Sequence, residues 1–269
     1  MYSICLILLF FLPAKTADMI INTDIKKYEE ERQWVIYTPE DTTPIEQVEE
    51  EEMVINNKET KTSTKNWWEY PDEIFTTTRS GDDMLVLVNK QYKLPSTYAP
   101  KDLVKASTSG IRRGENYYLR KILITDLTNL ITDSKAAGID LSIVSAYRSY
   151  QTQVSTYNYW LSKNDNDVAL VDTFSARPGH SQHQLGTVID FSSNEIGDRL
   201  GDEFGGTKAS KWLVENAYKY GFVISFPKGY EHITGYKFES WHYRYIGQSY
   251  ASEMINSGMI LENYLKSKN

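Results

Sequence analysis

Cysteine and long apolar segments are both scarce in this chain of 269 residues. The single cysteine, Cys5, excludes an internal disulfide, so any folded domain must be stabilised by its own core. The apolar run at 4–12 is shorter than the roughly 20 residues that a membrane-spanning helix requires. Such a run is typical of a secretory signal, although the first basic residue, Lys15, follows it instead of preceding it. We interpret residues 1–17 as a signal peptide or a short membrane anchor.

Basic residues are scarce in the segment that follows. Residues 18–52 contain 12 acids and 3 bases, a net charge of −9, whereas the whole chain carries −7. The rest of the chain is therefore close to neutral, which argues against a nucleic-acid partner because phosphate binding needs a basic face. We expect residues 18–83 to form an acidic and polar spacer that is partly disordered. Trp67 and Trp68 interrupt this spacer, so we expect part of it to pack on the following domain.

Histidine is also rare, yet two of the four histidines fall in two distinctive segments, SQHQLGTVID at 181–190 and ESWHYR at 239–244. These segments contribute His183, Asp190 and His242, and two imidazoles with a carboxylate are a usual ligand set for a catalytic zinc. Glu239 precedes His242 by three residues and is a carboxylate that could take a proton from a zinc-bound water. Taken singly, a His or Asp in such a place is more often a hydrogen-bonded structural residue. Their joint occurrence favours the metal site.

The spacing of these residues predicts their local structure. The β-branched and apolar stretch at 187–192 predicts a strand that carries Asp190 and is entered by a loop with His183. The alternation at 241–246 predicts a second strand with His242. Positions three apart lie on opposite faces of a regular strand, so the chain must bend between Glu239 and His242 if the two side chains share one site. We therefore expect Glu239 on a loop just before this strand.

Four stretches of the chain resemble the VanY-like D-alanyl-D-alanine carboxypeptidases, zinc peptidases that trim bacterial cell-wall peptides. They are LVLVNKQYKLPSTYAPKDLV at 85–104, GIDLSIVSAYRSYQTQ at 138–153, ARPGHSQHQLGTVIDFS at 176–192 and WLVENAYKYGFVISFPKGYEHITGYKFESWHYRYIG at 212–247. The resemblance covers about residues 84–265 and places the zinc carboxypeptidase domain at 84–269. It implies that His183, Asp190 and His242 bind zinc and that Glu239 is the catalytic base. Gln182 departs from the pattern, since many relatives carry Glu there.

The expected elements mix helices and strands without regular alternation. Strands are predicted at 85–89, 141–147 and 222–226 in addition to the two above, and helices at 125–139, 151–161 and 208–222. This arrangement indicates an α+β domain in which a small antiparallel sheet, flanked by helices, carries the metal. The resemblance implies the same fold.

Three further residues are candidates for substrate binding. The resemblance implies that Arg148 helps to hold the substrate's terminal carboxylate, and a guanidinium is suited to this because it forms paired hydrogen bonds with a carboxylate. Gln153 and Ser181 are neighbours of the proposed site and could bind substrate, with a structural role as the alternative. We expect His180 and His232 to be loop or surface residues.

The resulting hypothesis is a zinc-dependent D-alanyl-D-alanine carboxypeptidase that releases a C-terminal D-amino acid from peptidoglycan stem peptides. Three alternatives remain open at this stage: a cell-wall endopeptidase, a dipeptidase of the same fold, and a non-catalytic peptidoglycan-binding module. We expect a monomer located outside the cytoplasm, secreted or attached to the membrane through its N-terminus.

Overall fold

The computed structural model describes residues 65–269, which belong to one compact unit beginning at Thr62. The signal or anchor expected at 1–17 and most of the spacer expected at 18–83 lie outside the described residues. None of the helices described in residues 65–269 is long and apolar enough to cross a membrane.

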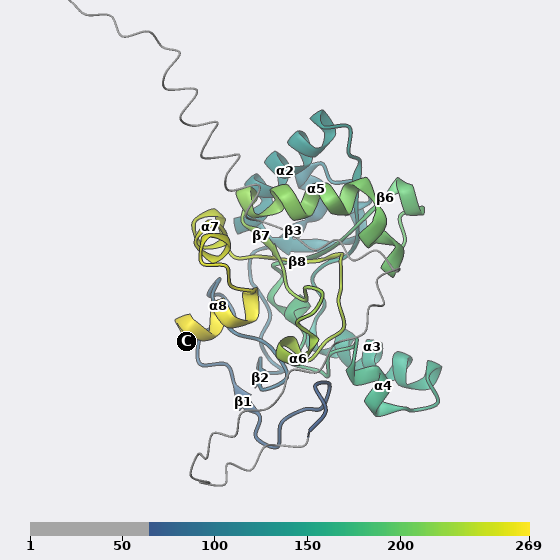
Figure 1. Cartoon of the computed structure of the whole chain (residues 1–269), viewed down its shortest axis with the longest axis vertical. Coiled ribbons are helices and arrows are strands. Elements are labelled where there is room, and N and C mark those ends of the chain that lie inside the picture. The colour runs from purple at the N-terminus through teal and green to yellow at the C-terminus, as the bar shows by residue number, and fades with distance from the viewer. Residues whose placement is uncertain (1–64) are drawn as a thin grey trace, which may run out of the picture. The chain divides into compact units, whose positions relative to one another are not determined.

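A four-stranded antiparallel sheet is the centre of the fold (Figure 1). Its strands are β5 (Leu141–Ser145), β6 (Val188–Ser193), β8 (His242–Tyr245) and β7 (Phe222–Ile224), in the spatial order β5-β6-β8-β7. All three pairings are antiparallel, and β5 carries a register irregularity between Ile143 and Ser145. The α+β class with a small antiparallel sheet is confirmed.

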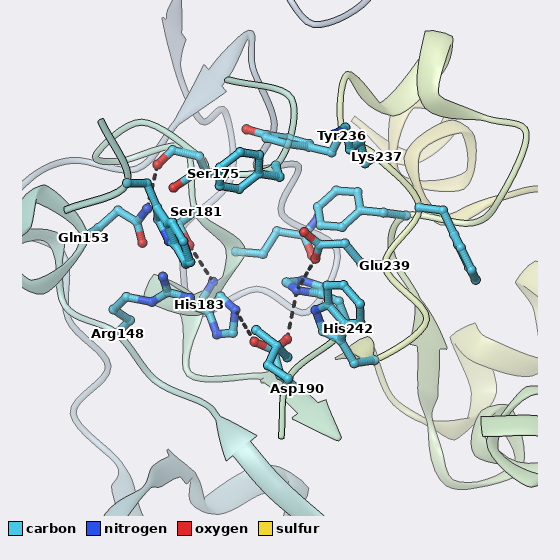
Figure 2. A pocket seen from close by; sticks show the side chains of 18 of the residues that line it. Arg148, Gln153, Ser175, Ser181, His183, Asp190, Tyr236, Lys237, Glu239 and His242 are labelled. Carbon is cyan, nitrogen blue, oxygen red and sulfur yellow. Dashed lines mark hydrogen bonds and ion pairs between the residues drawn. The ribbon is translucent and has the colours of Figure 1, made fainter. Parts of the chain in front are cut away.

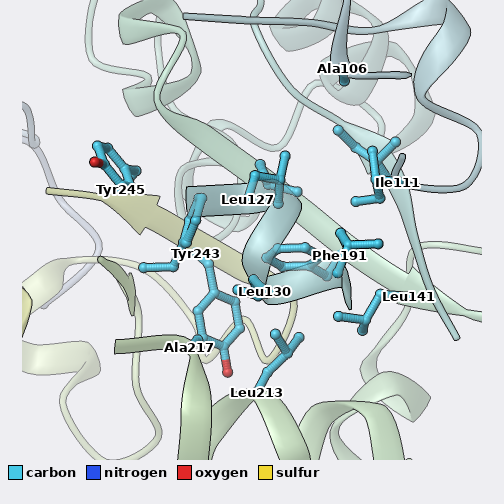
Figure 3. Packing of buried hydrophobic residues seen from close by; sticks show 14 of the residues in the cluster. Ala106, Ile111, Leu127, Leu130, Leu141, Phe191, Leu213, Ala217, Tyr243 and Tyr245 are labelled. Atoms are coloured by element: carbon cyan, nitrogen blue, oxygen red, sulfur yellow. The ribbon is translucent and has the colours of Figure 1, made fainter. Parts of the chain in front are cut away.

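One face of the sheet forms the main core. Strand side chains alternate between faces, so Ile189 and Phe191 of β6 lie on the same side as Tyr243 and Tyr245 of β8, where they are buried. Helices α2 (Ile124–Ala136) and α5 (Lys208–Asn216) cover this face (Figures 1 and 3). Burial of this face leaves the opposite face, with Asp190 and His242, for chemistry.

The remaining elements surround the sheet. The other helices are α3 (Tyr150–Lys163), α4 (Val168–Asp172), α6 (Glu231–Thr234), α7 (Gln248–Asn256) and α8 (Leu261–Lys268). Two small sheets pair β1 (Phe75–Thr76) with β2 (Tyr92–Lys93) and β3 (Leu103–Lys105) with β4 (Tyr118–Arg120). Short 3₁₀ helices are η1 (Ala106–Ser109), η2 (Gly114–Asn116), η3 (Lys121–Leu123), η4 (Gln182–Leu185), η5 (Asn194–Ile196), η6 (Asp202–Gly206) and η7 (Ala217–Tyr220).

Two of the expected elements differ from the structure. The strand expected at 85–89 is wrong: this segment is buried but is not part of any sheet, and Arg244 Nη2 donates to its Val86 carbonyl at 2.7 Å. A buried guanidinium thus replaces a partner strand as hydrogen-bond donor to this carbonyl. The helix expected at 208–222 ends as an α-helix at Asn216 and continues as η7 up to Gly221, which has a positive φ of 84°.

Residues 65–83 contact the rest of the domain through the β1–β2 pairing and through Tyr70. Its side chain is buried, and its hydroxyl lies 3.2 Å from the Tyr236 hydroxyl and accepts a hydrogen bond from the Arg177 backbone N–H at 2.9 Å. Part of the expected spacer, including Tyr70, therefore packs on the domain. The domain boundary expected at residue 84 stays a prediction.

Candidate metal centre and substrate cavity

Strand register brings two of the predicted ligands together. Asp190 on β6 and His242 on β8 are directly paired across the antiparallel ladder, so their side chains leave the same face of the sheet. His183 comes from η4, in the segment that leads into β6. The hydroxyl of Ser181 caps η4 by accepting the His183 backbone N–H at 3.3 Å, and Gly186, with a φ of 69°, ends this short helix.

The three side chains converge on one point (Figure 2). His183 Nε2 lies 3.2 Å from Asp190 Oδ2, and His242 Nδ1 lies 3.1 Å from Asp190 Oδ1. One potential ligand atom from each residue falls within 4.8 Å of the others, and all three residues are buried. The structure therefore assembles the trio that the sequence predicted.

The hydrogen bonds of this trio fit a cation. His183 Nδ1 lies 2.7 Å from the Ala146 carbonyl, which can only accept, so Nδ1 carries the proton and the Nε2 lone pair faces Asp190. Burial lowers the pKa of His183 to about 4, so its imidazole is neutral at pH 7. Two buried acceptors thus face each other 3.2 Å apart, and Asp190 Oδ1 makes no hydrogen bond within residues 65–269. A zinc ion between them would satisfy both acceptors.

Glu239 occupies a turn immediately before β8, as expected. The His242 backbone N–H donates to the Glu239 carbonyl at 3.3 Å, and this turn brings Glu239 Oε2 to 3.3 Å from His242 Nδ1. Burial, together with the negative charge of Asp190, raises the pKa of the Glu239 carboxyl well above its ordinary value, while Arg148 lowers it. A carboxylate with a raised pKa beside the metal position is suited to accepting and returning a proton.

A cavity of about 370 Å³ opens over these groups. Its lining includes every residue predicted for the site: Arg148, Gln153, Ser181, His183, Asp190, Glu239 and His242. The outer wall contains Trp160, Phe174 and Leu200, whereas Asp202 and Lys237 add one charge of each sign.

Arg148 lies beside His183 in this cavity (Figure 2). Its backbone N–H donates to the His183 carbonyl at 3.1 Å, while no carboxylate of residues 65–269 forms an ion pair with its guanidinium. Burial lowers the pKa of this guanidinium, and the negative charges of Asp190 and Glu239 raise it. A half-buried guanidinium without a side-chain partner in the described part of the chain is available for an anionic group of a ligand.

Gln153 and Ser181 have different environments. Gln153 Nε2 donates to the Ala176 carbonyl at 2.6 Å, and its buried Oε1 has no partner within the described part of the chain. This oxygen is free to accept from substrate. Ser181 has the structural role of capping η4, which leaves its hydroxyl proton for a second contact.

The expectation for His180 is only half right. It lies in a loop, but it is buried and lines the cavity instead of the surface. Its burial results from contacts with Asn89 and Tyr70, which are far away in sequence. No local pattern in the sequence signals such contacts. His232, in contrast, is exposed on α6, as expected.

Comparisons with known proteins agree with this geometry. The family model VanY, D-alanyl-D-alanine carboxypeptidase, matches residues 116–248. The putative carboxypeptidase YodJ of Bacillus subtilis is 38% identical over 197 residues, covering 71% of this chain and 70% of YodJ. A D-alanyl-D-alanine carboxypeptidase of Enterococcus faecalis is 30% identical over 212 residues, covering 74% of each chain. The chain belongs to the VanY family of D-alanyl-D-alanine carboxypeptidases.

Two solved structures support the fold and the metal. The LdcB LD-carboxypeptidase superimposes with a TM-score of 0.63 at 34% identity, covering 75% of this chain and 96% of LdcB. A mutant of the vancomycin-resistance D,D-pentapeptidase VanY in complex with Zn(II) gives a TM-score of 0.56 at 28% identity. The match covers 69% of this chain and 99% of the VanY chain. This VanY-family protein is a zinc metallopeptidase, and the donor set of His183, Asp190 and His242 fits the ion.

Proposed function

We propose that this enzyme removes the C-terminal D-alanine from peptidoglycan stem peptides, with Arg148 as the clamp for the terminal carboxylate. The observation that carries the proposal is the position of Arg148. Its guanidinium has no ion-pair partner in residues 65–269 and lines the same cavity as the metal ligands and Glu239. A cation held beside the reacting centre selects a peptide whose last residue carries a free carboxylate. An endopeptidase has no need of such a clamp.

The roles of the other residues follow from their positions. His183 Nε2, Asp190 and His242 Nδ1 would hold zinc, which when bound acidifies a water and polarises the scissile carbonyl. Glu239 takes the proton of the attacking water and returns it to the amine of the leaving D-alanine. Gln153 Oε1 accepts a hydrogen bond from the bound peptide, and Ser181 orients His183 while its hydroxyl donates to the substrate.

Mass spectrometry of digested muropeptides tests this function. The zinc-loaded protein should convert a pentapeptide stem ending in D-Ala-D-Ala into a tetrapeptide, with Glu239→Gln as the inactive control. A tetrapeptide shortened to a tripeptide would instead assign LD specificity, which is the activity named for LdcB. Loss of an intact D-Ala-D-Ala dipeptide would indicate a dipeptidase, and a cut within the stem would indicate an endopeptidase. Either of the last two results contradicts the carboxypeptidase proposal.

This substrate also suggests where the enzyme works. Peptidoglycan lies outside the cytoplasmic membrane, so we propose an extracytoplasmic location, as the apolar run at 4–12 also suggests. We also propose that the enzyme acts as a monomer. Cell fractionation with an antibody against the chain tests the first point. Sedimentation of the purified protein tests the second.

A further inference from the structure

His180 has a hydrogen-bond acceptor that the protein does not use. Its Nδ1 lies 2.8 Å from the Asn89 carbonyl, which can only accept, so Nδ1 carries the ring proton. Nε2 is then a lone-pair acceptor, and none of the hydrogen bonds within residues 65–269 involves it. The imidazole as a whole is buried, but Nε2 is not sealed from solvent, so a donor from water or from a ligand can reach it. His180 also lines the cavity that contains Arg148 and Glu239.

The surroundings of His180 hold its ring in one orientation. Asn89 is itself fixed, because its Nδ2 donates to Glu262 on α8 at 2.6 Å and its Oδ1 accepts the Tyr92 backbone N–H at 2.8 Å. The Tyr70 ring packs edge-to-face on the imidazole, with centroids 4.9 Å apart. A flipped imidazole would lose the bond to Asn89. The acceptor is therefore preorganised before any ligand binds.

Electrostatics restrict which donor His180 can accept. Burial first, and then the positive charges of Lys93, Arg177 and Lys90, lower the pKa of His180 to about 4. The same cations repel an ammonium group at this position, so a lysine side chain or a free α-amine of the substrate is a poor partner. A carboxylate has no proton to donate. A neutral N–H, such as a peptide amide, satisfies both conditions.

We propose that His180 Nε2 accepts a hydrogen bond from a backbone amide N–H of the bound stem peptide, on the N-terminal side of the scissile bond. The scissile amide itself is excluded, because its nitrogen becomes the leaving amine that Glu239 protonates. His180 is thus a specificity residue that sets the register of the peptide, while Arg148 holds its end. This inference rests on the proposed function.

A substrate series with single ester bonds tests the proposal directly. Each backbone amide upstream of the scissile bond is replaced in turn by an ester, which removes one N–H and changes the shape little. In the wild-type enzyme, one of these esters should be cleaved with a kcat/KM about 3–10-fold below that of the all-amide peptide, the scale of one neutral hydrogen bond. His180→Asn retains a donor toward Asn89 but lacks an acceptor at the Nε2 position. This variant should cleave the amide and that ester equally well, mainly through a raised KM for the amide.

His180→Gln provides the matched control, since its amide oxygen can reach the Nε2 position. It should recover part of the preference for the amide. Zinc content and thermal unfolding of both variants show whether the site stays folded. The proposal is overturned if no ester position is discriminated by the wild type, or if His180→Asn discriminates as the wild type does. A failure of the proposed function is distinguishable, because the wild type would then not release D-alanine from the all-amide peptide.

Discussion

Replacing Arg148 with alanine gives the sharpest test of how the enzyme selects its bond. The substitution removes the guanidinium but keeps the backbone N–H that donates to the His183 carbonyl at 3.1 Å. The metal trio should therefore keep its geometry and its zinc. A charge-assisted hydrogen bond contributes about 1.5–3 kcal/mol, which corresponds to roughly 10–150-fold in kcat/KM. We expect Arg148→Ala to lose about this factor on a stem peptide with a free C-terminal carboxylate.

The assay compares two substrates that differ only at the C-terminus, one with a free carboxylate and one with an amide. The wild type should prefer the acid by about 10-fold or more, and Arg148→Ala should show almost no preference. Arg148→Lys should recover only part of the preference, because an ammonium keeps the charge without the planar fork. Arg199→Ala is the matched control. Within residues 65–269, the exposed Arg199 side chain bonds only to the Ile196 carbonyl in its own turn.

If the wild type cleaves the acid and the amide with a kcat/KM ratio near one, both the clamp and the carboxypeptidase function are refuted. That result would favour an endopeptidase, whose cleavage does not depend on a distant C-terminus. A wild-type preference that persists in Arg148→Ala would move the clamp to another residue and leave the carboxypeptidase function in place.

Three further predictions concern the metal, the base and a buried lysine. His183→Ala and His242→Ala should each lose most of their zinc by elemental analysis, because each removes a ligand; stoichiometric zinc in both would refute the site. Glu239→Gln should keep its zinc while turnover falls on the order of 10²-fold or more, and near-normal turnover would exclude it as the base. Burial between Tyr70 and Tyr236 lowers the pKa of Lys90 from its ordinary value of 10.5 to about 7. Between these two pH values the Lys90 amine is protonated in the unfolded chain and largely neutral in the folded one, so the unfolded chain binds more protons. The stability of the wild type relative to Lys90→Met should therefore rise with pH in this range, by at most about 1.4 kcal/mol per unit. Urea unfolding at several pH values measures this slope, and a flat difference would contradict it.

The local patterns of the sequence were sufficient for the strands that carry the ligands. The β-branched, apolar stretch around Asp190 predicted β6, and the alternation around His242 predicted β8. The three-residue spacing of Glu239 and His242 predicted the turn between them. These predictions succeeded because side-chain periodicity and turn geometry depend on neighbours in the chain. The same reasoning failed at 85–89, because an apolar, β-branched segment indicates burial but not where its backbone hydrogen bonds go.

Three-dimensional packing decided the features that no local pattern contains. The register of β6 against β8 brought Asp190 and His242 together. No carboxylate within residues 65–269 forms an ion pair with the Arg148 guanidinium, which leaves it free for a ligand. His180, expected in a loop or at the surface, lies in a loop but is buried by its contacts with Asn89 and Tyr70. The sequence by itself determined which groups perform the chemistry, because the ligands and the base are identified by residue type and spacing. The tertiary structure alone decided their distances, burial and free hydrogen-bonding atoms, because these depend on contacts between residues far apart in the chain.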